Sequence, residues 1–270
     1  MTENSLRNIT TWSVPIILSF GVSTYIMATG LVAMKPSEEA QVALTKYLAQ
    51  KADIKPGSKI LDVGCGFGGS SVYLAKKYDA ETTGITISQV QVEMATESAS
   101  KVGANAKFAL MDAEDMKFDR LFDMVWSIES ISHYNNKEKF FTSATKFLKP
   151  GGTLAIIDWF KKEDLSDKEL KKFIEPIEEG MLVDLMTMED YKNIFEKNGL
   201  TVASFEDISK NCAKTWDISL DIIKNKDFWS LALRHGSEFV KFLRSFQAMK
   251  AGFSSGNFVY GLIVARKSDL

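Results

Sequence analysis

The sequence predicts an α/β protein with a doubly wound, mostly parallel sheet of seven strands and helical cap insertions. Three observations lead to this prediction: an apolar strand runs into a glycine-rich turn at residues 61–69, five strand-like runs alternate with helical patterns up to residue 160, and breakers such as Pro150 and Gly151 separate the runs. Strands that alternate with helices form parallel sheets with helices on both faces. The 270 residues suit one such domain with insertions.

The first strand ends in the sequence LDVGCGFGG at residues 61–69. Gly64 and Gly66 can take the left-handed conformations that a tight strand-to-helix turn requires, and they let a ligand lie against the main chain. A carboxylate inside an apolar strand is costly without a partner, so we expect Asp62 to face the turn and bind loop amides or the polar head of a ligand. The loop excludes a P-loop, which needs Gly-Lys-Ser/Thr, but it fits both NAD and other adenosine ligands.

The second and third strands narrow this choice. Residues 81–88 read ETTGITIS, and Thr86 stands where a dinucleotide fold has the acid that binds the ribose, which counts against NAD. Residues 108–116 read FALMDAEDM, an apolar strand that ends in an acidic turn. Asp112 is a ligand-binding candidate there, and the alternative is that Asp112 and Asp115 are ordinary turn or cap residues.

The fourth strand, residues 122–130, ends at the carboxyl edge, where an open α/β sheet binds its ligand. Glu129 and His133 follow that edge directly. The chain has two histidines, and one of them is at this position. A histidine side chain ordinarily has a pKa near neutrality, which suits His133 to accept a proton from a nucleophile. The alternative is that His133 caps a helix or binds a backbone carbonyl.

The rest of the chain completes the sheet and covers its edge. The pattern predicts a helix over 137–147, a fifth strand over 153–160, a helix over 187–198 with Thr187 as its N-cap, and strands over 200–208 and 257–266. An insertion of about fifty residues between the last two strands is rich in aromatic side chains, which favours a cap that closes over an apolar or aromatic acceptor, with core packing as the alternative. Candidates for the walls of the acceptor pocket are Trp126, Trp159, Phe160 and Trp216.

The N-terminal segment has two interpretations. Residues 9–34 contain no charged side chain and exceed the length that a bilayer-spanning helix needs. Pro15, Gly21 and Gly30 dilute the hydrophobicity, and the basic start and cleavage site of a secretory signal are missing. We expect a lid or substrate-channel helix, with a membrane-associated segment as the alternative.

Bulk properties favour a cytoplasmic enzyme. The net charge of −2 and the pI near 5.9 give no basic footprint for nucleic acid. Cys65 and Cys212 form no disulfide framework, which favours a reducing compartment. We expect no metal site, and the oligomeric state is left open, with a dimer among the options.

Four motifs together resemble those of class I S-adenosylmethionine-dependent methyltransferases. The glycine loop 61–69 resembles the first motif of these enzymes. The sequence LKPGGTL at 148–154 resembles their junction between the helix and the fifth strand. GITISQVQ at 84–91 is similar to the GITLSxxQ segment of tocopherol-type enzymes, and ESISH at 129–133 is similar to the ESxxH of tocopherol- and sterol-type enzymes. The opening of the insertion, Trp216 to Ser219, is similar to the tocopherol-type insertion as well.

This resemblance, which extends to plant and fungal N-methyltransferases, implies a Rossmann-like methyltransferase fold in one globular unit. Residues 1–35 would be the lid, 36–160 the cofactor-binding core, and 161–270 the rest of the sheet with its caps. It implies methyl transfer from S-adenosyl-L-methionine, with S-adenosyl-L-homocysteine as product, to N, C or O of a small molecule of secondary metabolism. The alternatives are a nicotinamide-dependent oxidoreductase, which Thr86 and Asp112 oppose, and a catalytically silent binding subunit.

The resemblance also implies roles for individual residues. Ile87, Ser88 and Gln91 would contact the ribose, and Asp112 would accept a hydrogen bond from the adenine amine while Ala113 or Glu114 donates a backbone N–H to the ring. Glu129 and His133 would stand between cofactor and acceptor as catalytic residues. The full cofactor-binding set is Asp62, Gly64, Cys65, Gly66, Ile87, Ser88, Gln91, Asp112, Ala113, Glu114, Ser127 and Ile128.

Overall fold

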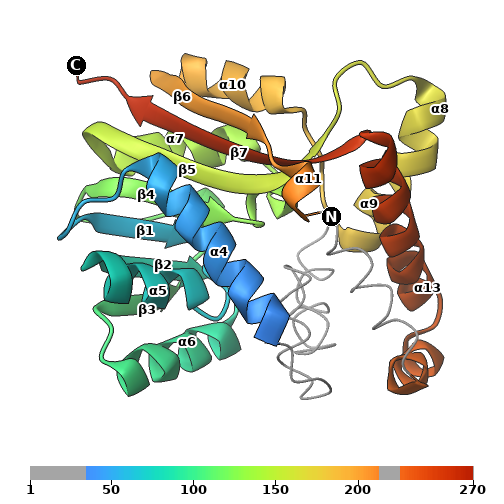
Figure 1. The fold of residues 1–270 in the computed structure, drawn as a ribbon, viewed down its shortest axis with the longest axis horizontal. Helices are drawn as coiled ribbons and strands as arrows, with labels where there is room; N and C mark the ends of the chain where they lie inside the picture. Colours follow the sequence, from blue (N-terminus) through green and yellow to red (C-terminus); the bar gives the residue numbers. More distant parts are fainter. Residues whose placement is uncertain (1–34, 213–225, 270) are drawn as a thin grey trace.

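The computed structural model describes residues 35–212 and 226–269, which form a seven-stranded sheet flanked by helices (Figure 1). The strand order is β3-β2-β1-β4-β5-β7-β6. Strands β1 to β5 pair in parallel, whereas β7 is antiparallel to both β5 and β6. This confirms the predicted mostly parallel α/β sheet. The strands are β1 Lys59–Val63, β2 Glu81–Thr86, β3 Ala106–Leu110, β4 Phe122–Ile128, β5 Leu148–Lys161, β6 Leu200–Asp207 and β7 Phe258–Lys267.

Helices cover both faces of the sheet. One face packs against α4 (Lys35–Ala52) and α5 (Gly69–Tyr78), with Leu48 and Leu74 fully buried. The other face packs against α7 (Lys137–Phe147) and α10 (Met188–Lys197). Helix α6 (Gln89–Val102) packs along the β3 edge. The helix predicted over 137–147 is confirmed to the residue.

Helix α10 begins where the sequence predicts. The hydroxyl group of Thr187 accepts a hydrogen bond from the Asp190 backbone N–H at 3.0 Å, and the Asp190 carboxylate accepts one from the Thr187 N–H at 2.9 Å. This capping box satisfies two helix-terminal donors.

A group of helices forms a cap beyond the carboxyl edge of the sheet, on the right in Figure 1. Its core contains Phe173, Ile177, Met181, Phe246 and Met249, so the elements of the cap pack on one another as well as on β7. The expected helical cap is present. Its elements are α8 Asp167–Glu169, the π-helical turn η3 Leu170–Ile174, α9 Glu175–Met181 and α13 Lys226–Ser255, and the short helix α11 Ser209–Cys212 follows β6.

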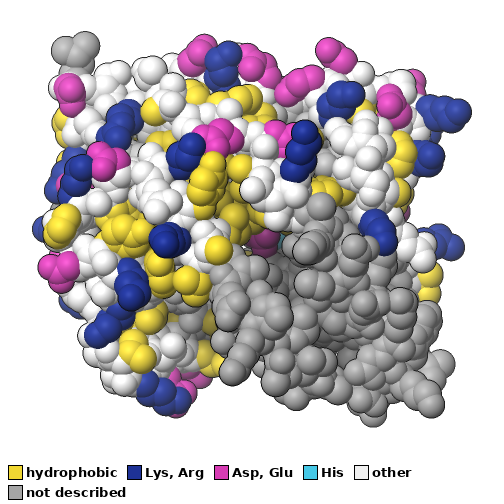
Figure 2. All heavy atoms as spheres, in the orientation of Figure 1, with side chains coloured by type: hydrophobic (Ala, Val, Ile, Leu, Met, Phe, Trp, Pro, Cys, Tyr) yellow, Lys and Arg dark blue, Asp and Glu magenta, His cyan; other side chains and the backbone are white. Residues whose placement is uncertain are grey.

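Two observations bear on possible partners. Basic and acidic side chains are interspersed on the face shown in Figure 2, so the described part of this face lacks the basic stripe that nucleic-acid binding requires. Among the described helices none is long and apolar enough to cross a bilayer. Residues 9–34, which we expect to form a lid or, as the alternative, a membrane-associated segment, lie outside the described residues.

Candidate active site

Three loops meet at the carboxyl edge of neighbouring strands. The backbone N–H groups of Gly64 and Cys65, after β1, both donate to the Ile85 carbonyl of β2 at 3.0 Å. The Met111 N–H, after β3, donates to the Thr86 carbonyl, also at 3.0 Å. The glycine loop, the end of β2 and the acidic turn after β3 therefore follow one another along the edge.

The two glycines of the first loop serve different purposes. Gly64 has a φ of 75°, and a Cβ there would lie 1.9 Å from Ser130 Oγ, so only glycine lets the loop touch the turn after β4. Gly66 has a φ of 54°, and no described atom lies within 4 Å of the position of a Cβ. The backbone of Gly66 thus borders open space, as a cofactor cradle requires.

Asp62 supports this loop from inside the sheet. Its carboxylate is buried and accepts a hydrogen bond from Ser71 Oγ on α5 at 2.6 Å, and not from the loop amides, the first of the two partners that we expect; the second, the polar head of a ligand, stays a prediction. Burial raises the pKa of Asp62 to about 6. Burial and the neighbouring Asp62 raise the pKa of the Cys65 thiol, so Cys65 is unsuited to act as a nucleophile.

Ser127 and Ile128, at the end of β4, also have supporting side chains. The hydroxyl group of Ser127 is buried and donates to the Val63 carbonyl at 2.9 Å. Ile128 packs against the core cluster on the α4 face. Because Ser127 as a whole is fully buried, its role in this structure is to hold the ends of β1 and β4 together.

Just after β2, an exposed apolar side chain is close in sequence to a glutamine whose side-chain amide is fixed by a hydrogen bond. Ile87 is 59% exposed, which is unusual for isoleucine. Ser88 caps α6 by accepting from the Gln91 N–H, and Thr86 Oγ1 donates to the Gln91 side-chain oxygen at 2.5 Å. Thr86 thus orients Gln91, which gives a physical role to the threonine that replaces the usual acid.

The acidic turn after β3 lies beside it. Asp112 is exposed and accepts from the Glu114 N–H at 2.8 Å, so it caps a 3-10 turn whose first residue, Ala113, is buried. The Glu114 carboxylate accepts from the Asn135 N–H at 2.8 Å, which connects this turn to the segment after His133.

Glu129 directly follows strand β4 and has a strained conformation. Its φ is 52°, in the left-handed region that residues with a Cβ rarely adopt. Its N–H donates to the Ile157 carbonyl at 2.8 Å, and its Oε1 accepts from the Tyr260 hydroxyl group at 2.8 Å. Burial, together with the charge of Asp158, raises the pKa of Glu129 to about 7. Such strain and such a pKa are typical of functional positions.

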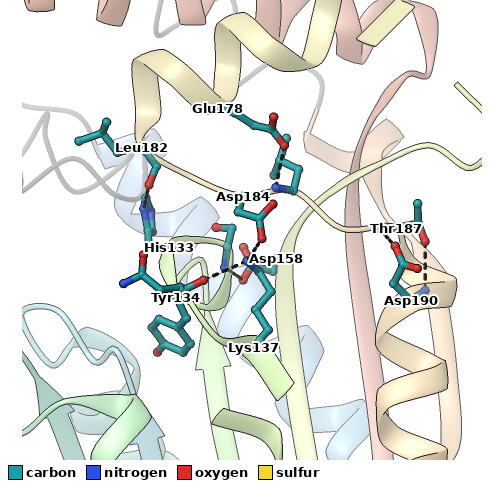
Figure 3. A network of polar contacts seen from close by, with 12 residues as sticks. His133, Tyr134, Lys137, Asp158, Glu178, Leu182, Asp184, Thr187 and Asp190 are labelled. Atoms are coloured by element: carbon teal, nitrogen blue, oxygen red, sulfur yellow. Dashed lines mark hydrogen bonds and ion pairs between the residues drawn. The ribbon is translucent and has the colours of Figure 1, made fainter. Parts of the chain in front are cut away.

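His133 lies on the short turn η2 (Ile131–His133) that follows (Figure 3). Its Nδ1 is 3.3 Å from the Leu182 carbonyl oxygen. Because a carbonyl only accepts, this contact places the proton on Nδ1 and makes Nε2 the basic nitrogen. Burial lowers the pKa of His133 to about 4, so the imidazole is neutral at neutral pH.

We expect the protein without added ligand to unfold at a higher temperature at pH 5 than at pH 8. Burial raises the pKa values of Asp62 and Asp158 to about 6 and that of Glu129 to about 7, so their contribution is fully present below their unfolded values near 4 and is lost as the pH rises through these values. His133, with its lowered pKa, acts in the opposite sense between about 6.5 and 4. Between pH 5 and pH 8 the three carboxyl groups lose more stability than the one imidazole gains, and the difference is on the order of 3 kcal/mol. Scanning calorimetry across this range measures the difference, and Glu129→Gln should reduce it; a higher midpoint at pH 8 would contradict the burial of these groups.

A polar clasp connects the cap to the turn that bears His133 (Figure 3). The buried Lys137 ammonium donates to Asp184 Oδ2 at 2.9 Å and to the Tyr134 carbonyl at 3.1 Å. The Asp184 N–H donates to the Ser132 carbonyl at 2.8 Å. Together with the contact between His133 and Leu182, these bonds fasten residues 182–184, which follow α9, to the carboxyl edge.

Asp184→Ala is expected to loosen the clasp, because Lys137 would keep a buried ammonium without its charged partner. The pair is exposed on the Asp184 side, so the free energy of unfolding should fall by about 1 kcal/mol. The KM for the acceptor should rise while the affinity for cofactor is unchanged, because the cap and not the glycine loop is released. Urea unfolding and steady-state kinetics measure both, with Glu97→Gln in an exposed pair with Lys101 as control. An acceptor KM equal to that of the control would show that the clasp does not shape the acceptor site.

The predicted wall residues occupy different environments. Trp159 is half-buried, stacks on Phe258 at 5.0 Å between ring centroids and lies 4.1 Å from the ring of Tyr260. Trp126 and Phe160 are fully buried in the core clusters of opposite sheet faces, so we reassign both to the core. Trp216 lies outside the described residues.

The sequence did not single out the partners of the candidate residues. Tyr260 and Ser71, which donate to Glu129 and Asp62, were not identified, and neither was the pair of Lys137 with Asp184. A carboxylate inside an apolar strand does signal that some donor must face it.

In the described part of the chain, no three histidine, cysteine or carboxylate side chains lie close enough to hold a metal ion.

Comparisons with known proteins agree with this geometry. The family model described as mycolic acid cyclopropane synthetase matches residues 24–256. The chain is 31% identical over 251 residues to a chloroplastic tocopherol O-methyltransferase of Arabidopsis thaliana, covering 85% of this chain and 70% of that protein. It is 30% identical over 236 residues to the 27-O-demethylrifamycin SV methyltransferase of Amycolatopsis mediterranei, covering 86% and 85%. A putative sarcosine dimethylglycine methyltransferase structure from Galdieria sulphuraria has the same fold, with a TM-score of 0.76 at 22% identity over 88% of this chain and 91% of that one.

Proposed function

Because the chain belongs to the mycolic acid cyclopropane synthetase family of class I S-adenosylmethionine-dependent methyltransferases, we propose that it methylates a small acceptor with an apolar or aromatic-ring-bearing body. The enzyme class and the cofactor follow from the family. The acceptor, and the choice among nitrogen, carbon and oxygen, belong to the proposal. The half-buried Trp159 and the aromatic-rich cap core support an acceptor of this kind.

The residues at the carboxyl edge fit the cofactor. The open space at Gly66 leaves room for a ligand against the main chain, exposed Ile87 offers an apolar surface, and the carboxylate of Asp112 is exposed beside it. When bound, S-adenosylmethionine supplies an electrophilic methyl group on a sulfonium centre. We assign Gln91, whose side chain is held by Thr86, to the ribose, and Ala113 or Glu114 to the adenine ring.

One observation supports the proposal more than any other: the glycine loop and the turn that bears the candidate catalytic residues are in direct contact. Gly64 packs so closely on Ser130 that no other residue type fits. Ser130 follows Glu129 directly and stands three residues before His133. We infer that a ligand on the glycine loop lies beside the turn that bears both candidate catalytic residues.

The chain itself contributes alignment, exclusion of water and proton acceptance. Fixed loops and a cap place the acceptor in line, which supplies much of the acceleration for a methyl transfer. Nε2 of His133 or the carboxylate of Glu129 accepts the proton of an N–H, O–H or C–H nucleophile. The pKa of Glu129 is about 7, which suits it to accept a proton near neutral pH. The pKa of His133 is about 4, so an imidazolium formed there is a strong acid at neutral pH and releases its proton to another group.

The proposal extends to the organisation of the chain. We assign residues 1–35 to a lid or substrate-channel segment, 36–160 to the cofactor-binding core and 161–270 to the remaining strands with their cap. The family match begins at residue 24 and so includes the last residues of the first segment.

Calorimetric titration tests the proposal. The purified chain should bind S-adenosylmethionine and S-adenosylhomocysteine in the micromolar range and should not bind NAD. Amines, phenols and prenylated rings are then screened with labelled cofactor, and mass spectrometry identifies the methylated atom. Binding of NAD alone, or methylation only of charged acceptors without an apolar body, would contradict the proposal.

A further inference from the structure

We propose that Tyr260 is a positioning residue for methyl transfer, whose hydroxyl group holds the carboxylate of Glu129 in place at the carboxyl edge of the sheet. This inference rests on the proposed function of Glu129. The two residues are 131 positions apart in the sequence and come from strands that are separated by β5. The Tyr260 hydroxyl donates to Glu129 Oε1 at 2.8 Å.

Tyr260 is itself held firmly. Its N–H donates to Ser209 Oγ at 2.9 Å, and its carbonyl accepts from the Ile208 N–H at 2.8 Å, so the segment leading into α11 fixes its backbone. The ring lies 4.1 Å from that of Trp159, and the residue is only 2% exposed. Buried tyrosine hydroxyl groups as a rule have a hydrogen-bond partner, and for Tyr260 the partner is Glu129.

The strained backbone of Glu129 indicates that its hydrogen bond with Tyr260 serves function. Its left-handed conformation is unfavourable for a residue with a Cβ and persists only where the surroundings impose it. A glutamate placed merely for stability would gain nothing from such a conformation. The hydrogen bond from Tyr260 occupies Oε1 and thereby sets the direction of the remaining oxygen, Oε2.

Among the described residues, three groups from three elements interact with the Glu129 carboxyl group: Asp158 from β5, Tyr260 from β7 and Cys212 from α11. Burial and Asp158 favour the protonated form of Glu129, whereas the hydrogen bond from Tyr260 favours the carboxylate. Removing the hydroxyl group therefore makes Glu129 harder to ionise. The fraction of enzyme with a carboxylate ready to accept a proton at neutral pH falls accordingly.

Tyr260→Phe tests this role, with Tyr47→Phe as the matched control. Tyr47 also donates to a glutamate, Glu206, at 2.7 Å, but on an exposed surface. We expect Tyr260→Phe to move the acid limb of the kcat/KM profile to higher pH by about one unit, which is about a tenfold loss of activity below the limb. Cofactor affinity should be unchanged, and Tyr47→Phe should leave the profile in place.

A second measurement is independent of turnover. Infrared titration follows the carboxyl band of Glu129, assigned by its disappearance in Glu129→Gln, and its midpoint should rise in Tyr260→Phe. Site-specific 3-fluorotyrosine at position 260, a stronger donor, should lower the midpoint and keeps the test available if the phenylalanine variant does not fold. An unchanged midpoint, or an equal loss of activity at every pH, would overturn the positioning role. Absence of methyl transfer in the unsubstituted enzyme would refute the proposed function alone, because the infrared titration still reports on the pair.

Discussion

Replacement of Gly66 by valine is expected to abolish binding of S-adenosylmethionine. The position of a Cβ at residue 66 borders open space, so the valine side chain would fill the volume that we assign to the ligand. The φ of 54° adds strain, because a β-branched residue is especially unfavourable in the left-handed region. We expect affinity to fall by at least about 100-fold, or about 3 kcal/mol, in calorimetric titration.

Gly57→Val separates the loss of space from the strain. Gly57 also has a positive φ, 76°, and no described atom within 4 Å of a Cβ, but it precedes β1 and so lies at the opposite edge of the sheet. This variant should lose similar stability and keep normal affinity. If Gly66→Val binds the cofactor as tightly as the control does, the glycine loop is not the cofactor cradle.

The fold could be predicted because its signals are local. Helix α7 has apolar residues at helical spacing and a Pro-Gly stop, and Thr187 with Asp190 forms a capping box within four residues. The β5 boundary shows the limit of such signals. Residues 149–152 look like a breaker, yet β5 begins at Leu148, because a register shift opposite Phe122 absorbs the irregular stretch. The irregular stretch is tolerated in β5 because β5 pairs with β4, and such pairing cannot be seen in the sequence of one segment alone.

The site could be predicted in part for the same reason. Each cofactor loop is a short motif, and parallel pairing brings the motifs to one edge. The contacts that tune the candidate catalytic groups are distant in sequence: Tyr260 comes from β7, and Leu182 from the end of α9. In the alternating pattern of β7, Tyr260 looks like any other buried position. The aromatic content of the sequence likewise did not separate pocket walls from core. Trp126 and Phe160 lie within strands, and their side chains are buried in the core clusters on the two faces of the sheet.

The second large effect is expected at His133, where alanine should lower turnover by about 10²- to 10⁴-fold while cofactor affinity stays nearly intact. The imidazole lies on the turn after β4 and not on the glycine loop, so its removal leaves the cofactor contacts in place. Single-turnover kinetics with a saturating acceptor measure the loss directly. Asn136→Ala provides the control: it removes the N-cap of α7, costs about 1 kcal/mol of stability and should leave turnover unchanged.

His133→Asn decides between proton transfer and support of the cap. The asparagine amide nitrogen can take the place of Nδ1 and donate to the Leu182 carbonyl, so this variant keeps the link to the clasp while losing the basic nitrogen. If His133 accepts a proton, the asparagine variant should be as slow as the alanine variant at every pH. If asparagine restores turnover, the imidazole works by holding residues 182–184 against the edge, and proton acceptance falls to Glu129. Because the pKa of Glu129 is about 7 and that of His133 about 4, the two cases also differ in the acid limb, which would lie near pH 7 in the second.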